Sequence, residues 1–509
     1  MEFHPPVGMT MAEAVGALSD ALTVRQRPER GRERSYYDTF DGLLHGEGLD
    51  LVFEAGDLVL CDHASGSARA RASLPRPRRP LLVSSLTPGE LRGALDEVVG
   101  VRALLSLARV HCRERAIDVI DDERKTVVRL TLSAPAVLVP DGSTEVLAPR
   151  LAVEGLRGYD DDLARVCGVL RDQLFFTDAA QSLAHEAVLA SGGTPGGVSS
   201  KAVVALDGEQ SAASAVTAVL RAQLEIIEAN LAGVLADIDS EFLHDFRVAV
   251  RRTRAVQREA KDVFAPDGLA RFRVEFRWLQ QVTGDARDID VYLLGFEELR
   301  AMIAVPLRAD LDPLLAVLRT RHRRAHTAMN RALRSDRATS LPDAWRAFLV
   351  ALEAGDGGLA ATMTIAEVAG RRIRTVYRQM VRMGSAVDAD TAPEEYHELR
   401  KKGKELRYLL ELFGTPLYPA EVVKPLVKAL KGLQDVLGRH QDREVQAATL
   451  RSLQDEVAGA PGGVAALVAV GALIQRLAED EQAARAQFKE HFAPFAAGDQ
   501  RRLVKETFR

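Results

Sequence analysis

The sequence predicts an α+β protein whose first part mixes strands with helices and whose second part is almost entirely helical. Three observations support this prediction. Short β-branched runs alternate with turn residues before residue 190, apolar residues recur every three or four positions after residue 205, and a pair of motifs occurs twice in the second part. We infer two helical bundles that derive from one duplicated unit and pack about a pseudo-twofold axis.

The composition is that of a globular protein with several domains. The 509 residues, of which 47% are hydrophobic and 27% charged, allow two to four domains at roughly 100–200 residues each. The three widely spaced cysteines, Cys61, Cys112 and Cys167, match neither a disulfide framework nor a zinc site. The first residues lack the pattern of a signal peptide, and no apolar run is long enough to span a bilayer. We therefore expect a cytoplasmic protein with no membrane partner.

A segment rich in Gly and Ser at 191–204 is the predicted linker, because Pro195 blocks regular structure and the small residues lower the cost of disorder. It separates a domain at 1–190 from a helical domain at 205–505, whose two repeats cover about 205–355 and 360–505. Residues 1–200 hold 22 Lys and Arg against 29 Asp and Glu, and the remainder holds 45 against 43. Neither part is a polycation, so any anion site must come from local clustering.

Within the first domain, β-branched runs and capping residues place the elements. The expected strands are Leu49–Phe53, Leu58–Cys61, Thr126–Leu132 and Leu151–Val153, and the expected helices are Pro88–Gly100 and Asp160–Leu174. Residues 121–123 fit a hairpin turn between Ala116–Ile120 and Thr126–Leu132. Prolines confine Arg69–Pro80 to an exposed loop or a sheet edge.

The helical domain opens with Ala212–Leu235, where apolar residues form one stripe of a helix. Similar periodicity recurs in Leu311–Leu333, Ile365–Met383, Pro425–Leu437 and Val464–Phe488. In the repeated motifs described next, Gly284 and Gly438 are expected to end helices.

Self-comparison shows that a motif beginning at His244 recurs 153 residues later at His397. In both copies basic residues follow the histidine at +3, +7 and +10; they are Arg247, Arg251 and Arg254 in the first copy and Arg400, Lys404 and Arg407 in the second. A second motif begins at Leu279 and recurs at Leu433, with an offset of 154. Two linked motifs in a fixed order predict a duplicated unit.

On an α-helix the four motif positions fall within an arc of about 80° and form a ridge about 15 Å long. Like charges on one helix face repel, and here the acids Asp245, Glu398 and Glu405 lie off the ridges. Three interpretations remain open: a solvated basic face, pairing of each arginine with an acid on a neighbouring helix, or a docking strip for phosphates. Duplication of the residue types favours phosphates.

Further chemistry in this half is less specific. The histidines lack the spacing of metal ligands, and we expect them to contact an anion rather than to act as catalysts. Asp285, Asp288 and Asp290 suggest a Mg²⁺ ion, but the second copy has no counterpart set, so no metal site is predicted. Asp288 and Asp442 are expected to cap a helix or to pair with ridge arginines.

The segments at 244–254, 284–290, 397–407 and 433–442 resemble the conserved histidine α-helical domain, CHAD, over about residues 205–505. The resemblance implies two antiparallel four-helix bundles that bind inorganic polyphosphate on a basic surface, with targeting to polyphosphate granules. By position this role carries over to the eight ridge residues. To these we add neighbouring cations as predicted polyphosphate-binding residues: Arg252, Arg371, Arg374, Arg378, Lys401 and Arg439.

Residues 35–44, with the sequence SYYDTFDGLL, and the hairpin at Asp121–Asp122 resemble a CYTH triphosphate tunnel domain, which often precedes CHAD. The opening Glu-x-Glu-x-Lys strand of that family is missing, and the Arg and Glu residues that line its tunnel are depleted beyond Leu49. On a later strand Glu154 is the remaining candidate acid. The resemblance therefore implies a degenerate antiparallel β-barrel without catalytic residues, metal or cofactor.

Together these patterns predict a polyphosphate-binding protein that is more consistent with a binding module than with an enzyme. Three alternatives stay open: a metal-dependent triphosphatase in the first domain, a nucleic-acid-binding protein, and a scaffold whose ridges pair internally. The ridges carry few of the aromatic residues on which bases stack, so nucleic acid is the less favoured polyanion. The sequence identifies no protein partner.

Overall fold

The computed structural model describes residues 1–139, 141–200, 204–388 and 391–508. It forms two compact units, Met1–Ser200 and Lys201–Arg509. The first contains the strands and the second is helical, so the predicted α+β class is confirmed.

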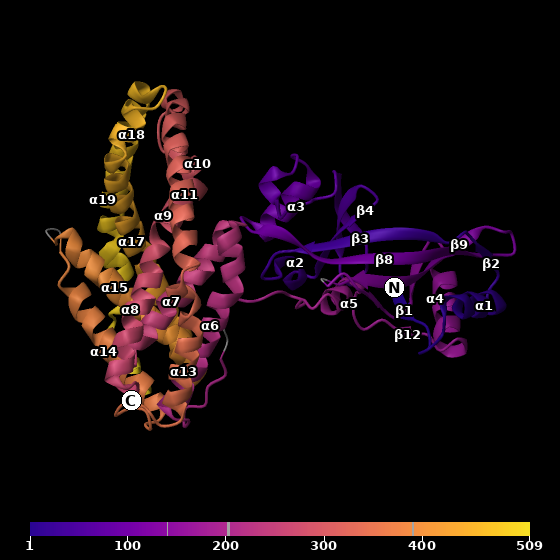
Figure 1. Cartoon of the computed structure of the whole chain (residues 1–509), viewed down its shortest axis with the longest axis horizontal. Helices are drawn as coiled ribbons and strands as arrows, with labels where there is room; N and C mark the ends of the chain where they lie inside the picture. Colours follow the sequence, from indigo (N-terminus) through magenta and orange to yellow (C-terminus); the bar gives the residue numbers. More distant parts are fainter. Residues whose placement is uncertain (140, 201–203, 389–390, 509) are drawn as a thin grey trace. The chain divides into compact units, whose positions relative to one another are not determined.

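The first unit is a curled antiparallel sheet that forms an open half-barrel (Figure 1). Its strand order is β12-β1-β11-β9-β8-β3-β4-β5-β6, with β10 on β9 and with β2 and β7 on β8. The strands are β1 (Glu2–His4), β2 (Val24–Gln26), β3 (Arg30–Asp38), β4 (Leu49–Glu54), β5 (Asp57–Asp62), β6 (Ala68–Ser73), β7 (Leu81–Leu82), β8 (Ala103–Ile120), β9 (Thr126–Leu138), β10 (Thr144–Val146), β11 (Arg150–Gly155) and β12 (Thr177–Asp178).

Short helices cover both faces of this sheet. Side chains alternate along its strands, so each face carries apolar residues that the helices bury. The helices are α1 (Met11–Ala21), α2 (Leu43–Gly46), α3 (Glu90–Val99), α4 (Asp160–Gly168) and α5 (Leu183–Ala190). On β3, Tyr37 packs in the core beneath α2 and α3, whereas the adjacent Tyr36 packs in the core beneath α5. A third core lies between α1, α4 and strands β8, β9 and β11. The predicted strands, helices and the hairpin between β8 and β9 are all present, and Arg69–Pro80 begins on the edge strand β6.

The segment that follows α5 lies against the start of α2. The backbone N–H of Val198 donates to the carbonyl of Phe40 at 2.9 Å. A Cβ at Gly42, where φ is +68°, would lie 2.2 Å from the backbone of Gly196. Gly42 is thus required by both its backbone conformation and this close approach.

The helical unit contains α6 (Ala212–Ala236), α7 (Ser240–Glu259), α8 (Pro266–Val282), α9 (Gly284–Leu294), α10 (Phe296–Ala301), α11 (Asp312–Leu333), α12 (Asp336–Thr339), α13 (Leu341–Glu353), α14 (Ile365–Ser385), α15 (Pro393–Leu409), α16 (Thr415–Leu417), α17 (Ala420–Ser452), α18 (Gln454–Ala458), α19 (Gly463–Phe495) and α20 (Gly498–Thr507). One group of packed helices is α6, α7, α8 and α13, and the other is α14, α15, α17 and α19 with α20.

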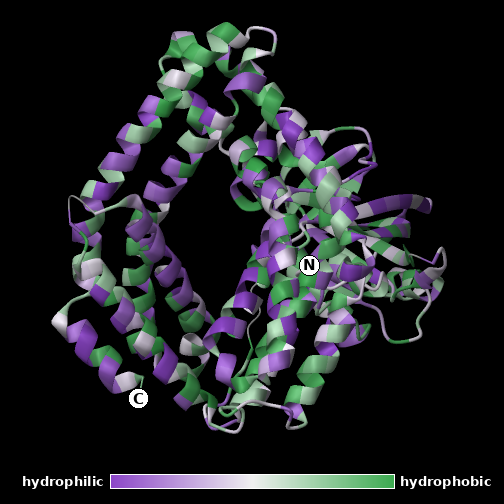
Figure 2. Cartoon of the chain, turned by 60° about the vertical axis from the view of Figure 1, so that its left-hand side comes forward, coloured by the Kyte–Doolittle hydropathy of each residue, from purple (hydrophilic) through white to green (hydrophobic). Residues whose placement is uncertain are grey.

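The long helices α17 and α19 form a hairpin joined by α18, and α9 to α11 lie beside it (Figure 1). Leu314 and Leu318 of α11 share one core with Leu473 and Leu477 of α19. Figure 2 shows hydrophilic and hydrophobic segments alternating along these helices, as amphipathic packing requires. Among the residues that the structure describes, no helix is both long and apolar enough to cross a membrane.

The two glycines of the repeated second motif behave differently. Gly284 begins α9, directly after the break at Thr283, so a helix boundary lies there as expected. The prediction that Gly438 ends a helix is wrong, because Gly438 lies inside α17. The neighbours Leu437 and His440 are buried, so packing of this stretch against α19 outweighs the low helix propensity of one glycine.

The starts of the two repeats meet. Ser211 and Thr364 cap the N-termini of α6 and α14 in the same way, since each side-chain oxygen accepts a backbone N–H three residues later. They are 153 residues apart, which is the offset of the first motif, and they form an antiparallel β-bridge with each other. Equivalent residues therefore face one another across a pseudo-twofold axis.

Candidate functional site

The first motif of each repeat lies on α7 and on α15, and these two helices pack against each other. We call this contact, together with the π-helical turn Leu410–Gly414 that follows α15, the seam. Arg252 donates to Glu411 at 3.1 Å across the seam, and Arg258 lies 3.7 Å from Glu405. Positions 252 and 405 are equivalent, as are 258 and 411, so the pseudo-twofold axis exchanges the two ion pairs.

The two predicted ridges meet at this seam. Lys404 is the counterpart of Arg251, and partial removal from water together with the charges of Arg400, Arg251 and Arg407 lowers the pKa of Lys404 to about 8. We call these four residues the seam cluster. Arg400 pairs with Asp442 at 2.9 Å and Arg407 with Glu411 at 2.8 Å. Within the described part of the chain, Arg251 and Lys404 make no ion pair.

In both repeats the second motif positions the histidine of the first. The guanidinium of Arg287 lies 2.9 Å from Nδ1 of His244, so this ring nitrogen accepts, because arginine has only donors. Nδ1 of His397 instead donates to Oε1 of Gln441 at 2.5 Å. Arg287 and Gln441 are equivalent positions of the second motif, yet they select opposite tautomers of the two histidines.

A glutamine of the second motif likewise holds the last arginine of each ridge. Arg254 donates to Oε1 of Gln280. In the other repeat Arg407 lies 3.5 Å from Oε1 of Gln434, which is 154 residues after Gln280. The spacing of the two motifs thus reflects direct contacts between α7 and α8 and between α15 and α17.

The second ridge position differs between the repeats. Arg247 is buried, and it donates to the carbonyl of Gln280 at 2.7 Å and to Oγ1 of Thr283 at 2.8 Å, where α8 breaks before α9. Burial and the charge of Arg251 lower the pKa of Arg247 to about 10. Since α17 continues where α8 breaks, Arg400 has no such carbonyl and pairs with Asp442 near the surface.

The six other predicted binding residues lie away from the two ridges. Arg252 belongs to the seam ion pairs, and Lys401 pairs with Glu398 at 2.7 Å on the exposed face of α15. Arg439 approaches Gln487 of α19 at 3.4 Å. Arg371 is exposed on α14, whereas Arg374 and Arg378 line a separate groove between α14 and α20.

Sequence reasoning missed the residues that position the ridges, namely Gln280, Arg287, Gln434 and Gln441. It also missed Arg277 of α8, whose charge, after burial, lowers the pKa of Arg254. The signal was present, because Gln280 and Gln434 stand at equivalent places in the repeated second motif, as do Arg287 and Gln441.

The acidic residues after Gly284 do not converge. Asp290 is turned toward α11, where its carboxylate lies 2.7 Å from Nε2 of His322, and this contact raises the pKa of His322. Asp285 and Asp288 lie near Arg247 and oppose the lowering of its pKa. No group of three or more His, Cys, Asp and Glu residues close enough to hold a metal occurs among the described residues of the chain.

A charged cluster of the first unit lies on the sheet face that α5 also covers. Arg34 pairs with Glu54 at 2.9 Å and with Glu114 at 2.8 Å, and Arg32 pairs with the same two carboxylates at 3.1 and 3.3 Å. The predicted depletion of Arg and Glu overlooked this set, because its members come from three strands. Two cations and two carboxylates neutralise each other, so the cluster carries no excess charge for an anion. Glu154 lies elsewhere, exposed on β11 opposite Arg129 of β9.

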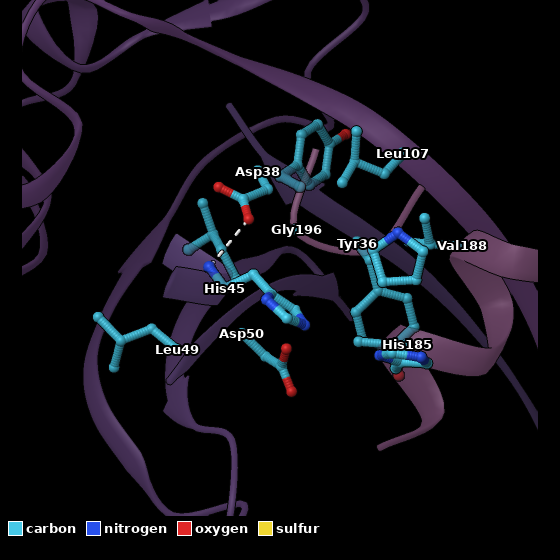
Figure 3. Close-up of a pocket in the computed structure, with 13 residues that line it drawn as sticks. Tyr36, Asp38, His45, Leu49, Asp50, Leu107, His185, Val188 and Gly196 are labelled. Atoms are coloured by element: carbon cyan, nitrogen blue, oxygen red, sulfur yellow. Dashed lines mark hydrogen bonds between the residues drawn. The ribbon is translucent and has the colours of Figure 1, made fainter. Parts of the chain in front are cut away.

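The segment that resembles the CYTH family ends β3 and begins α2 (Figure 3). Asp38 accepts the backbone N–H groups of Thr39, Leu44 and His45 at 2.7–3.0 Å. Burial raises the pKa of Asp38, although these hydrogen bonds oppose the shift. The cavity beside it, which His185 also lines, has a volume of about 30 Å³. That is room for about one water molecule and too little for a triphosphate.

Comparison with known proteins assigns the helical unit. The CHAD domain family model matches residues 218–451. Two curated proteins of Mycobacterium tuberculosis, "Uncharacterized protein MT2285" and "Uncharacterized protein Rv2226", are each 30% identical over 232 residues, which cover 43% of this chain. The chain spans 42% of the length of these relatives.

Two solved structures are also similar. The CHAD domain from the plant Ricinus communis is 27% identical with a TM-score of 0.47, over 57% of this chain and 95% of that one. PptA from Streptomyces chartreusis is 20% identical with a TM-score of 0.43, over 56% of this chain and 99% of that one.

Proposed function

Residues 218–451 form a CHAD domain, and from this premise we propose that the chain binds inorganic polyphosphate at the seam between α7 and α15. One observation carries the proposal. Arg251, Arg400 and Arg407 are close enough to Lys404 for their charges to lower its pKa, and neither Arg251 nor Lys404 makes an ion pair within the described residues. A polyanion that crosses the seam gives these two cations a direct ionic partner, whereas the carboxylates of Asp288 and Asp442 act on them without forming an ion pair.

The seam favours a polymer over a single phosphate. The two ridges run along separate helices, with Arg251 and Lys404 near the contact between them, so one small anion contacts a fraction of the cations. A chain of phosphates engages both ridges at once, and affinity rises with chain length because each added contact is intramolecular. The same binding also provides a way to target the protein to polyphosphate granules in the cytoplasm, where the polymer is concentrated.

Charge reversal with a matched control tests the proposal on the full chain. Lys404→Glu and Arg251→Glu are expected to weaken binding of fluorescently labelled long-chain polyphosphate by about tenfold or more. Lys401→Glu, on the same helix but paired with Glu398, is expected to weaken it less than about twofold. Equal losses in Lys401→Glu and Lys404→Glu, with unchanged circular dichroism, would show that general charge rather than the seam binds the polymer.

Length, salt and competition separate polyphosphate from the alternatives. Binding is expected to be much tighter for long-chain polyphosphate than for orthophosphate. It is also expected to weaken steeply with salt, because added salt reduces the free energy gained when the protein releases counterions from the polymer. Displacement of the polymer by single-stranded RNA or DNA at equal phosphate concentration would favour a nucleic-acid-binding protein. Unchanged binding with lost stability in both seam variants would favour a scaffold.

The triphosphatase alternative rests on the Arg32, Arg34, Glu54 and Glu114 cluster of the first unit. These residues are already paired with each other at 2.8–3.3 Å. A triphosphate has to compete with both carboxylates for each arginine, which makes this the less favoured site. Release of phosphate from tripolyphosphate with Mg²⁺ or Mn²⁺, and its loss in Arg34→Ala, would support the enzyme.

A further inference from the structure

A second basic surface lies between α14 and α20. It is a groove of about 520 Å³ whose walls carry five cations, Arg374, Arg378, Arg382, Arg501 and Lys505. Tyr377, Val381 and Val504 line it between these walls and are themselves nearly buried. No carboxylate lines the groove among the described residues, and none of the five cations makes an ion pair there.

The groove is separate from the seam. Arg372 of α14 points toward the seam, where it contacts Glu259 and lies 3.0 Å from Glu405. Arg374 and Arg378 are two and six residues further along, which places them on a different side of the helix at ~100° per residue. The two faces of α14 thus serve different surfaces, and the groove is not a continuation of the ridges.

The cations repeat with the period of a helix. Arg374, Arg378 and Arg382 are four residues apart on α14, so they span about 12 Å in steps of about 6 Å. Arg501 and Lys505 on α20 are also four residues apart and span about 6 Å. Two rows of positive charge therefore flank an apolar floor.

We propose that this groove docks an acidic amphipathic helix of a partner protein. Such a helix presents an apolar stripe with Asp or Glu on both sides, repeating every three or four residues, and so matches the floor and both rows. Most of the surface that lines the groove is apolar, and an inorganic polyphosphate chain has no apolar surface to pack against it. A small phosphate ester reaches only part of a row about 12 Å long.

A designed peptide serves as the probe, with the full chain as receptor and fluorescence anisotropy as readout. The peptide has roughly five helical turns, Leu along one stripe and Glu on both sides. We expect it to bind at least about tenfold more tightly than a scrambled peptide of the same composition. The double variant Arg378→Glu/Arg382→Glu is expected to weaken binding by about tenfold or more, and Lys505→Glu by a smaller factor.

Controls distinguish the groove from general charge and from the seam. Arg371→Glu, on the exposed surface of α14 outside the groove, is expected to change peptide binding by less than about twofold. A peptide with Lys in place of Glu is expected to bind the double variant more tightly than the unmodified chain. Equal binding of the scrambled peptide, or no effect of the double variant, would overturn the proposal.

Polyphosphate provides the remaining arm. If the proposal holds, long-chain polyphosphate leaves the peptide bound at concentrations that saturate Lys404-dependent binding. Displacement of the peptide at those concentrations, together with loss of polyphosphate binding in the double variant, would assign the groove to the polymer instead. Peptide binding and its loss in Arg378→Glu/Arg382→Glu do not depend on Lys404, so failure of the seam proposal removes this competition arm but leaves the peptide test intact.

Discussion

Lys404 of α15 and Arg251 of α7 are equivalent residues of the two repeats, and they are close enough for the charge of Arg251 to help lower the pKa of Lys404 to about 8. Without a bound anion the arrangement is electrostatically unfavourable. A protein that keeps these like charges close together at its seam is less stable than it could be, as is common at binding sites.

The first prediction is that Lys404→Met raises the melting temperature while it weakens polyphosphate binding. Removing the ammonium relieves its repulsion with Arg251, Arg400 and Arg407, and we expect a gain on the order of 1–2 °C at pH 7. Differential scanning calorimetry measures the change. Lys401→Met, whose ammonium pairs with Glu398, is the control and is expected to give no gain.

The second prediction concerns pH. Lys404 is charged below a pKa of about 8 and loses its charge as the pH rises through that value, so polyphosphate affinity is expected to fall between pH 7 and 9. The variant Lys404→Arg keeps its charge over this range, and its affinity is expected to stay flat. Titrations with labelled polyphosphate at constant ionic strength test this, and parallel pH profiles for the two proteins would contradict it.

The third prediction is that Arg252 stabilises the seam rather than contacting the ligand. Arg252→Glu places a second carboxylate beside Glu411. This variant is expected to lose about 1–2 kcal/mol of unfolding free energy, which lies between the values for exposed and buried ion pairs. The swap Arg252→Glu/Glu411→Arg is expected to recover at least half of this loss with little change in polyphosphate binding. A swap that restores stability but leaves binding about tenfold weaker would place Arg252 in the binding surface.

The sequence could predict the ridges because their signal is local. His, Arg and Lys at 0, +3, +7 and +10 must share one face of any helix, and repetition 153 residues later marked the duplication. The meeting of Arg251 with Lys404 could not be read from either motif. It depends on how α7 packs on α15, which is decided by residues on both helices at once.

The same distinction explains the errors. Gly438 looked like a helix stop because the equivalent Gly284 does lie at a helix break. In the second copy the packing of α17 on α19 keeps the chain helical past Gly438. In the first unit, the pairing of Arg34 with Glu54 and Glu114 joins residues of β3, β4 and β8. Their proximity comes from strand register, which a count of charges along the chain does not contain.

The fourth prediction is that Gln434 acts as a positioning residue. Its Oε1 lies 3.5 Å from Arg407, as Gln280 contacts Arg254 in the other repeat. Gln434→Leu removes the acceptor at similar volume, and we expect polyphosphate affinity to fall by about two- to fivefold with a reduced salt dependence. Gln434→Glu keeps an acceptor but adds a negative charge, and its loss is expected to be larger and to shrink at high salt. Equal losses in both variants at all salt concentrations would point to a purely structural role.

The fifth prediction concerns the buried carboxylates beneath the seam, Glu259 and Glu405. Arg372 contacts both side chains, and burial together with the neighbouring Glu405 raises the pKa of Glu259 to about 7. A carboxyl whose pKa is raised in the folded state holds its proton more tightly there. Its contribution to stability is therefore full below the ordinary value near 4.5 and is lost as the pH rises toward 7.

Glu259→Gln mimics the protonated side chain and removes this pH dependence. The melting temperature of the variant relative to that of the unmodified chain is expected to rise by about 2–4 °C between pH 5 and pH 7.5, the shift that roughly 1 kcal/mol produces. Comparing the two proteins at each pH cancels the titration of all other groups. Glu398→Gln, an exposed residue of the same unit, is expected to show no such trend over this range, because Lys401 lowers the pKa of Glu398. A constant difference between Glu259→Gln and the unmodified chain would mean that Glu259 is already ionised at pH 5 and that the arginines outweigh its burial.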